Sequence, residues 1–81
     1  MAMASNELYS FNLHGTRYDV ISLKDASEVY CSLRDDSFEG ASTFPMPKLY
    51  KTVDGGTRKE YGRIAYNGRI FDKSGACVYD L

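Results

Sequence analysis

Residues 8–21 read Leu-Tyr-Ser-Phe-Asn-Leu-His-Gly-Thr-Arg-Tyr-Asp-Val-Ile, and this stretch decides the fold. His14 and Gly15 separate two runs in which apolar and polar residues alternate, and they predict a two-residue hairpin turn because glycine adopts a positive φ at little cost. The pairs expected on the apolar face are Leu13–Thr16, Phe11–Tyr18 and Tyr9–Val20. The pairs expected on the polar face are Asn12–Arg17 and Ser10–Asp19. Such alternation is typical of a sheet with one buried side.

An amphipathic helix is expected after this hairpin, over about residues 22–35. Ser22 is a favourable N-cap, and the helix dipole favours an acid such as Asp25 in the first turn. The apolar residues that fall on one stripe at helical spacing are Leu23, Ala26, Val29, Tyr30 and Leu33. Carboxylates are unfavourable at a helix C-terminus, so Asp35 and Asp36 predict that the helix ends near Arg34.

Residues 40–47 are expected to form an extended connector between the helix and the second half of the chain. Pro45 and Pro47 each push the preceding residue into extended geometry and end helical structure. Phe44 and Met46 are large and apolar, so we expect both side chains to attach the connector to the body of the domain.

Residues 48–80 are expected to form an antiparallel meander. The turns that contain glycine lie at residues 54–56, 67–68 and 74–75. The cross-strand pairs that these turns predict are Tyr50–Tyr61, Lys51–Glu60, Arg63–Asp72, Ile64–Phe71, Phe71–Val78 and Arg69–Asp80. In this alignment Ile64, Phe71 and Val78 form one apolar row across three strands, which predicts that the row is buried.

The order of these segments predicts a small single α+β domain with the element order β-β-α-β-β-β-β. Its twisted antiparallel sheet, a hairpin plus a C-terminal meander, is expected to be covered on one face by the single helix. Of the 81 residues, 7–81 are expected to form the domain and 1–6 a flexible N-terminus. A core this small gives a thin stability margin, so a homodimer stays open as an alternative to a monomer.

The compartment that the sequence predicts is cytoplasmic. No apolar run approaches the ~20 residues that a membrane helix needs, and the first residues lack the basic and apolar regions of a signal peptide. We therefore expect no membrane contact. Cys31 and Cys77 are too few for a disulfide scaffold, so free thiols are expected in a reducing compartment.

Catalytic groups are scarce in this chain. His14 is the only imidazole, and its place in a turn beside Gly15 favours a solvated side chain over a general base. Cys31 falls in the middle of the expected helix, where neither a base nor the N-terminal dipole is placed to activate the thiol. One His and two distant Cys match no zinc spacing. We therefore expect no enzyme, no metal and no cofactor, and a reactive Cys31 is the least favoured alternative.

Charge is distributed unevenly along the chain. Residues 1–47 contain three basic and seven acidic residues, whereas residues 48–81 contain seven basic and four acidic residues. The C-terminal half interleaves basic with aromatic residues, namely Arg58, Lys59, Arg63, Arg69 and Lys73 with Tyr50, Tyr61, Tyr66 and Phe71. Platforms for single-stranded nucleic acid use this combination, although cross-strand ion pairs and the core use the same residue types.

These observations favour a small non-enzymatic module that binds a protein partner, as an inhibitor, adaptor or regulator does. The first set of candidate partner-binding residues is Tyr61, Arg63, Tyr66 and Arg69, and the second is the acidic set Asp35, Asp36 and Glu39. The alternative is a protein that binds single-stranded nucleic acid through its basic and aromatic C-terminal sheet, with an affinity that falls steeply as salt rises.

Overall fold

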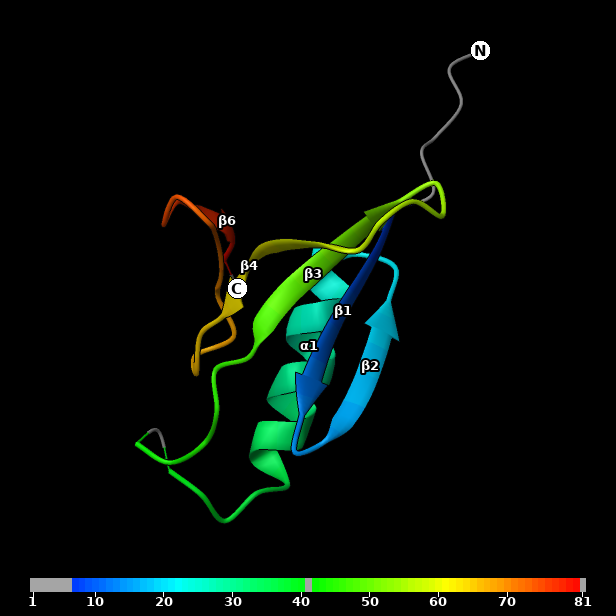
Figure 1. Ribbon diagram of the computed structural model, residues 1–81. Coiled ribbons are helices and arrows are strands. Elements are labelled where there is room, and N and C mark those ends of the chain that lie inside the picture. Colours follow the sequence, from blue (N-terminus) through cyan, green and yellow to red (C-terminus); the bar gives the residue numbers. More distant parts are fainter. Residues whose placement is uncertain (1–6, 41, 81) are drawn as a thin grey trace.

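The computed structural model describes residues 7–40 and 42–80 (Figure 1), and the expected flexible N-terminus, residues 1–6, lies outside the described residues. The elements are β1 (Glu7–Leu13), β2 (Thr16–Val20), α1 (Leu23–Asp35), β3 (Lys48–Val53), β4 (Lys59–Ile64), β5 (Ile70–Asp72) and β6 (Cys77–Tyr79). The predicted α+β class and the predicted order β-β-α-β-β-β-β are confirmed.

The strands form one antiparallel sheet in the spatial order β2-β1-β3-β4-β5-β6. Because β1 lies between β2 and β3, the connection from β2 to β3 must cross over β1. α1 forms this crossover and packs on β1 and β2, and Figure 1 shows it behind these strands. One face of the sheet is therefore covered by α1, and β2 and β6 are its two edges.

The first hairpin has the predicted register at every pair. Tyr9 lies opposite Val20, Phe11 opposite Tyr18 and Leu13 opposite Thr16, and the two polar pairs also match. His14 has a φ of 50° and Gly15 a φ of 80°. Two positive φ values in a two-residue loop define a type I′ turn, whose twist matches that of the strands it joins. Local turn chemistry thus sets the register of β1 and β2.

α1 begins where the sequence predicts. Ser22 is the N-cap, and its Oγ accepts a hydrogen bond of 3.1 Å from the backbone N–H of Asp25. The helix ends at Asp35, which agrees with the expected range of about residues 22–35. Along its inner stripe the fully buried side chains are Ala26, Ser27 and Tyr30, and the partly buried ones are Leu23, Val29 and Leu33. The apolar stripe is therefore confirmed, with one buried serine added to it.

The core lies between α1 and the sheet. Its buried apolar side chains are Tyr9, Phe11, Leu13, Val20, Ala26, Tyr30, Phe44, Leu49, Ile64 and Ile70. Phe44 attaches the connector as expected, because its ring packs on that of Tyr30 with centroids 5.5 Å apart. The Tyr30 hydroxyl donates to the Pro45 carbonyl over 2.8 Å, and burial raises the pKa of Tyr30 to about 12. Met46 does not attach the connector, because half of it is exposed.

A β-bulge changes the register between β3 and β4. The observed pairs are Lys48–Arg63, Leu49–Gly62, Tyr50–Glu60 and Lys51–Lys59, with the shift between Leu49 and Tyr50. Tyr61 is the extra residue on β4, and its ring packs edge-to-face on Tyr9 with centroids 5.6 Å apart. The predicted pairs Tyr50–Tyr61 and Lys51–Glu60 are therefore wrong, because the pairs next to the turn are displaced by one residue. The extra residue Tyr61 brings Leu49–Gly62 and Lys48–Arg63 back into the predicted alignment.

The turn between β4 and β5 is one residue longer than predicted. Ala65 N–H donates to the Arg69 carbonyl over 2.8 Å, and Gly68 N–H donates to the Ala65 carbonyl over 2.9 Å. Gly68 has a φ of 91°, the positive value that the last position of a three-residue loop requires. The observed pairs are Gly62–Asp72, Arg63–Phe71 and Ile64–Ile70. The predicted pairs Arg63–Asp72 and Ile64–Phe71 are wrong for this reason.

The predicted apolar row of Ile64, Phe71 and Val78 is also wrong. The observed pairs between β5 and β6 are Ile70–Tyr79 and Phe71–Cys77, with a register shift between them. Ile64 thus shares its row with Ile70 and Tyr79, and Phe71 lies on the other face of the sheet. The predicted association of Arg69 with Asp80 is confirmed, since Nε of the arginine lies 2.8 Å from Oδ1 of the aspartate.

Candidate functional site

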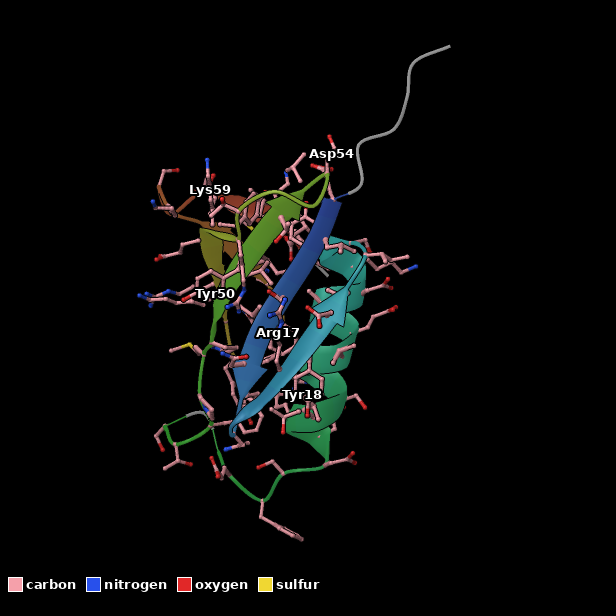
Figure 2. The ribbon with its side chains drawn as sticks, turned by 45° about the vertical axis from the view of Figure 1, so that its right-hand side comes forward. Arg17, Tyr18, Tyr50, Asp54 and Lys59 are labelled. Carbon is pink, nitrogen blue, oxygen red and sulfur yellow. The ribbon has the colours of Figure 1, made fainter. Side chains whose placement is uncertain are left out.

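The face of the sheet that α1 leaves uncovered, called the open face below, is the candidate binding surface. Cross-strand partners lie on the same face and neighbours along a strand on opposite faces, so the registers assign each residue. The residues assigned to the open face are Leu8, Ser10, Asn12, Arg17, Asp19, Lys48, Tyr50, Thr52, Glu60, Arg63, Phe71 and Cys77. Figure 2 looks onto this face with α1 behind it and labels Arg17 and Tyr50.

The guanidinium of Arg58 lies over the ring of Tyr50. Its Cζ is 4.0 Å from the ring centroid, a cation–π contact, and its Nε donates to Ser10 Oγ over 2.8 Å. Ser10 is paired with Tyr50 across β1 and β3, so one strand pair positions both groups that hold the guanidinium. Nη2 of Arg58 is buried and has no hydrogen-bond partner among the described residues. Two contacts therefore hold the guanidinium, and one of its donors is left unsatisfied.

A second row of open-face side chains runs beside this stack. Lys48, Arg63 and Phe71 lie opposite one another across β3, β4 and β5. A hollow of ≈ 360 Å³ opens here, and its lining residues are Glu60, Gly62, Arg63, Phe71, Asp72, Lys73 and Gly75. Phe71 is half-buried, and Arg63 is exposed. An aromatic ring and a cation thus border the same concave surface.

Cations outnumber carboxylates over the open face and its Arg58 stack. The cations are Arg17, Lys48, Arg58 and Arg63, and the carboxylates are Asp19 and Glu60. Arg17 pairs with Asp19 over 3.0 Å, and Lys48 pairs with Glu60 over 3.7 Å. Within residues 7–40 and 42–80, neither Arg58 nor Arg63 has a carboxylate partner. The open face therefore carries two uncompensated positive charges.

The four residues of the first predicted binding set do not share a surface. Arg63 lies on the open face, and Arg69 is engaged with Asp80 beside β6. Tyr66 lies in the β4–β5 turn, where the Arg34 guanidinium stands 5.5 Å from its ring centroid. Tyr61 packs on the opposite side of the sheet from Arg63. The structure thus brings none of these side chains together with another of the set.

Tyr61 belongs to a cluster around Lys51 on the helix side of the sheet. Lys51 Nζ lies 5.3 Å from the Tyr61 ring centroid and 5.7 Å from that of Tyr9, and it forms an ion pair of 2.6 Å with Glu7. The hydrogen bond with Glu7 raises the pKa of Lys51, and burial raises the pKa of Tyr9. These contacts are directed within the fold, so the cluster has a structural role.

The second predicted set, the acidic one, does lie in one region. Asp35, Asp36 and Glu39 are exposed at the end of α1 and just beyond it. Arg34 pairs with Asp35 over 3.1 Å, and this hydrogen bond raises the pKa of Arg34. The side chain of Phe38 stands fully exposed between the second and third of these acids. This acidic end of the helix is a second, smaller candidate surface.

The described residues offer little for chemistry beyond binding. Cys31 is half-buried and Cys77 exposed, both as free thiols, and the exposed His14 packs edge-to-face on Phe44 at 5.7 Å. Within this part of the chain no three His, Cys, Asp or Glu residues gather to hold a metal, and no helix has the length and apolar character to cross a membrane. The chain matches no protein-family model, and neither a curated protein nor a solved structure is detectably similar to it.

Proposed function

We propose that this protein is a non-enzymatic module that binds single-stranded nucleic acid through the open face of its sheet. The observation that supports the proposal is the placement of two aromatic rings, Tyr50 and Phe71, on the uncovered face, among cations that no carboxylate neutralises. Antiparallel sheets that bind single strands use surface aromatics to stack bases and neighbouring basic groups to hold phosphates.

The geometry suits a single nucleic-acid strand that runs across the β-strands of the sheet. Tyr50 lies on β3 and Phe71 on β5, so the two rings are separated by β4, or roughly 10 Å at the usual strand spacing. On β4, Arg63 lies opposite Phe71 and Glu60 lies opposite Tyr50, and the Arg58 guanidinium lies over the Tyr50 ring.

The formal net charge of −1 is compatible with this function, because cations outnumber carboxylates on the open face and part of the acidic charge lies away from it. The acidic residues Asp35, Asp36 and Glu39 follow the helix on the far side of the sheet, whereas Arg58 and Arg63 serve the open face. A dipolar charge distribution orients an approaching polyanion toward the positive face.

Fluorescence anisotropy with labelled single-stranded DNA and RNA oligonucleotides tests the proposal. We expect binding at low salt, weaker binding to a duplex, and a slope of log K against log salt of about −2 if three phosphates are contacted. Tyr50→Ala and Phe71→Ala should each weaken binding about tenfold through lost stacking. Phe38→Ala removes an equally aromatic, fully exposed side chain away from the open face and is the matched control. Absence of binding at low salt, or equal losses in all three variants, would refute the proposal.

A second candidate function is protein binding by an inhibitor or adaptor, and one observation favours it. Phe38 is fully exposed beside Asp36 and Glu39, and an aromatic ring in water next to charges is typical of an interface anchor. The partner would present an apolar pocket with a basic rim. Affinity capture with the wild-type chain and with Phe38→Ala tests this: a partner retained by the wild type and lost by the variant supports it, and equal capture contradicts it.

A further inference from the structure

β2 is an edge strand whose outer side no described strand covers. It pairs with β1 alone and spans Thr16–Val20 without proline. Ile21, which follows it, is 73% exposed. An uncovered edge of this kind presents unpaired backbone N–H and C=O groups and is a template for another strand.

The type I′ turn determines which backbone groups point outward. In such a turn the flanking residues, Leu13 and Thr16, form a hydrogen-bonded pair, and hydrogen-bonded pairs alternate along an antiparallel ladder. Thr16, Tyr18 and Val20 therefore direct their backbone groups to β1. The backbone groups of Arg17 and Asp19 point to the free side of the strand. Any strand that joins this edge must pair with these two residues.

A second copy of the same strand is the occupant whose charges match. Two antiparallel copies related by a two-fold axis can place Arg17 opposite Arg17, Asp19 opposite Asp19, or Arg17 opposite Asp19 and keep the outward groups paired. The first two arrangements set like charges directly opposite each other, which is destabilising. In the third, each copy pairs its arginine with the other copy's aspartate, and Tyr18 lies on the axis. The strand is self-complementary in one register only.

We propose that the protein forms a two-fold homodimer through antiparallel pairing of β2 with β2 of a second copy. The side chains already face the correct way, since Arg17 and Asp19 share the open face, half-exposed, and pair with each other over 3.0 Å. Tyr18 lies on the other face and stacks on Phe11, its partner on β1, with centroids 5.4 Å apart. The dimer joins the two sheets into one and sets both open faces on the same side.

Charge exchange tests this register independently of any ligand. Arg17→Asp and Asp19→Arg each place like charges opposite each other, so each variant alone should lower the association constant about tenfold or more in sedimentation equilibrium. The double variant exchanges both charges and should dimerise like the wild type. An equimolar mixture of the two single variants should also form a dimer, because each supplies the charge that the other lacks.

Matched controls are Arg69→Asp and Asp80→Arg, which alter an equally exposed ion pair beside the opposite edge and should leave association unchanged. Circular dichroism shows whether each variant is folded. The mixture of single variants restores the pairing of opposite charges between the two copies without any further substitution. A wild-type chain that sediments at 9.1 kDa at every concentration overturns the proposal. Self-association that the single variants leave intact overturns it as well, because another surface would then be responsible.

Discussion

Ser27 Oγ donates a hydrogen bond of 2.7 Å to the carbonyl oxygen of Gly68, a residue 41 positions later in the chain. Ser27 is fully buried on α1, and Gly68 closes the turn between β4 and β5. The bond connects the helix to the turn between β4 and β5, whereas α1 otherwise packs mainly on β1 and β2. It therefore secures the meander that bears Phe71 and Arg63.

Ser27→Ala should lower the free energy of unfolding by about 1–2 kcal/mol, because the buried Gly68 carbonyl then has no donor. Urea unfolding followed by circular dichroism measures the change. Ser32→Ala alters an exposed serine of the same helix and should change stability by less than about 0.5 kcal/mol. Equal effects of the two substitutions would show that the hydrogen bond contributes nothing.

Gly62→Ala should disrupt the pairing of β4 with β5. A Cβ atom at Gly62 would overlap the Phe71 carbonyl oxygen and lie 2.8 Å from Cα of Asp72, so the backbone must shift. We expect a loss of about 3 kcal/mol, the upper range for overpacking. Gly40→Ala is the control, since a Cβ there meets no atom within 4 Å. Thermal unfolding of both variants should show a large drop for the first alone.

Alkaline pH should destabilise the fold through Tyr30. Its pKa is about 12 in the folded chain, and about 10 is usual for an exposed tyrosine, so the unfolded state loses its proton first. The stability that this group contributes is fully present below pH 10 and falls as the pH rises toward 12, by about 2–3 kcal/mol in total. Urea midpoints measured from pH 8 to pH 12 test this.

Tyr30→Phe serves as the comparison for the pH series. It loses the hydrogen bond to the Pro45 carbonyl and should be less stable by about 1 kcal/mol at neutral pH. Its stability should fall less steeply than that of the wild type above pH 10, because phenylalanine has no proton to lose. Parallel curves for the two proteins would mean that other groups, and not Tyr30, cause the alkaline loss.

Local signals in the sequence were sufficient for the first hairpin and the helix. His14 and Gly15 determine a type I′ turn, and Ser22 with Asp25 determines the helix start, within a few residues of the structure that each controls. The meander is different, because one inserted residue in a strand or loop displaces the pairs on one side of it relative to those on the other. Tyr61 is such a residue, and its burial against Tyr9 depends on a partner 52 positions earlier.

The candidate site depended on contacts that no local pattern encodes. Interleaved basic and aromatic residues were visible in the sequence, among them Tyr50, Arg58 and Phe71. Their gathering on one face follows from the pairing of β3 with β1 and from the corrected register of β5. Ser10, which holds the Arg58 guanidinium, is separated from it by 48 positions. The alternation of polar and apolar residues in β1 predicted that Ser10 lies on the polar face, but it did not predict the contact of Ser10 with Arg58.

Arg58→Lys separates the role of the guanidinium plane from that of its charge. Lysine keeps one positive charge but cannot lie flat on the Tyr50 ring while it donates to Ser10 as the Arg58 guanidinium does. We expect single-strand affinity to fall about tenfold with an unchanged salt slope, since the number of neutralised phosphates stays the same.

Arg63→Gln should show the opposite combination, namely a changed salt slope with the stack over Tyr50 intact. It removes an exposed charge of the open face without altering the stack over Tyr50, so the salt slope should become shallower by about 0.7 for one lost phosphate contact. Anisotropy titrations of both variants at several salt concentrations make the comparison. If Arg58→Lys binds as tightly as the wild type, the stack is only a structural support for β1 and β3. If instead both variants make the slope equally shallow, the lysine has lost a phosphate contact, and the guanidinium of Arg58 positions a phosphate rather than a stacked base.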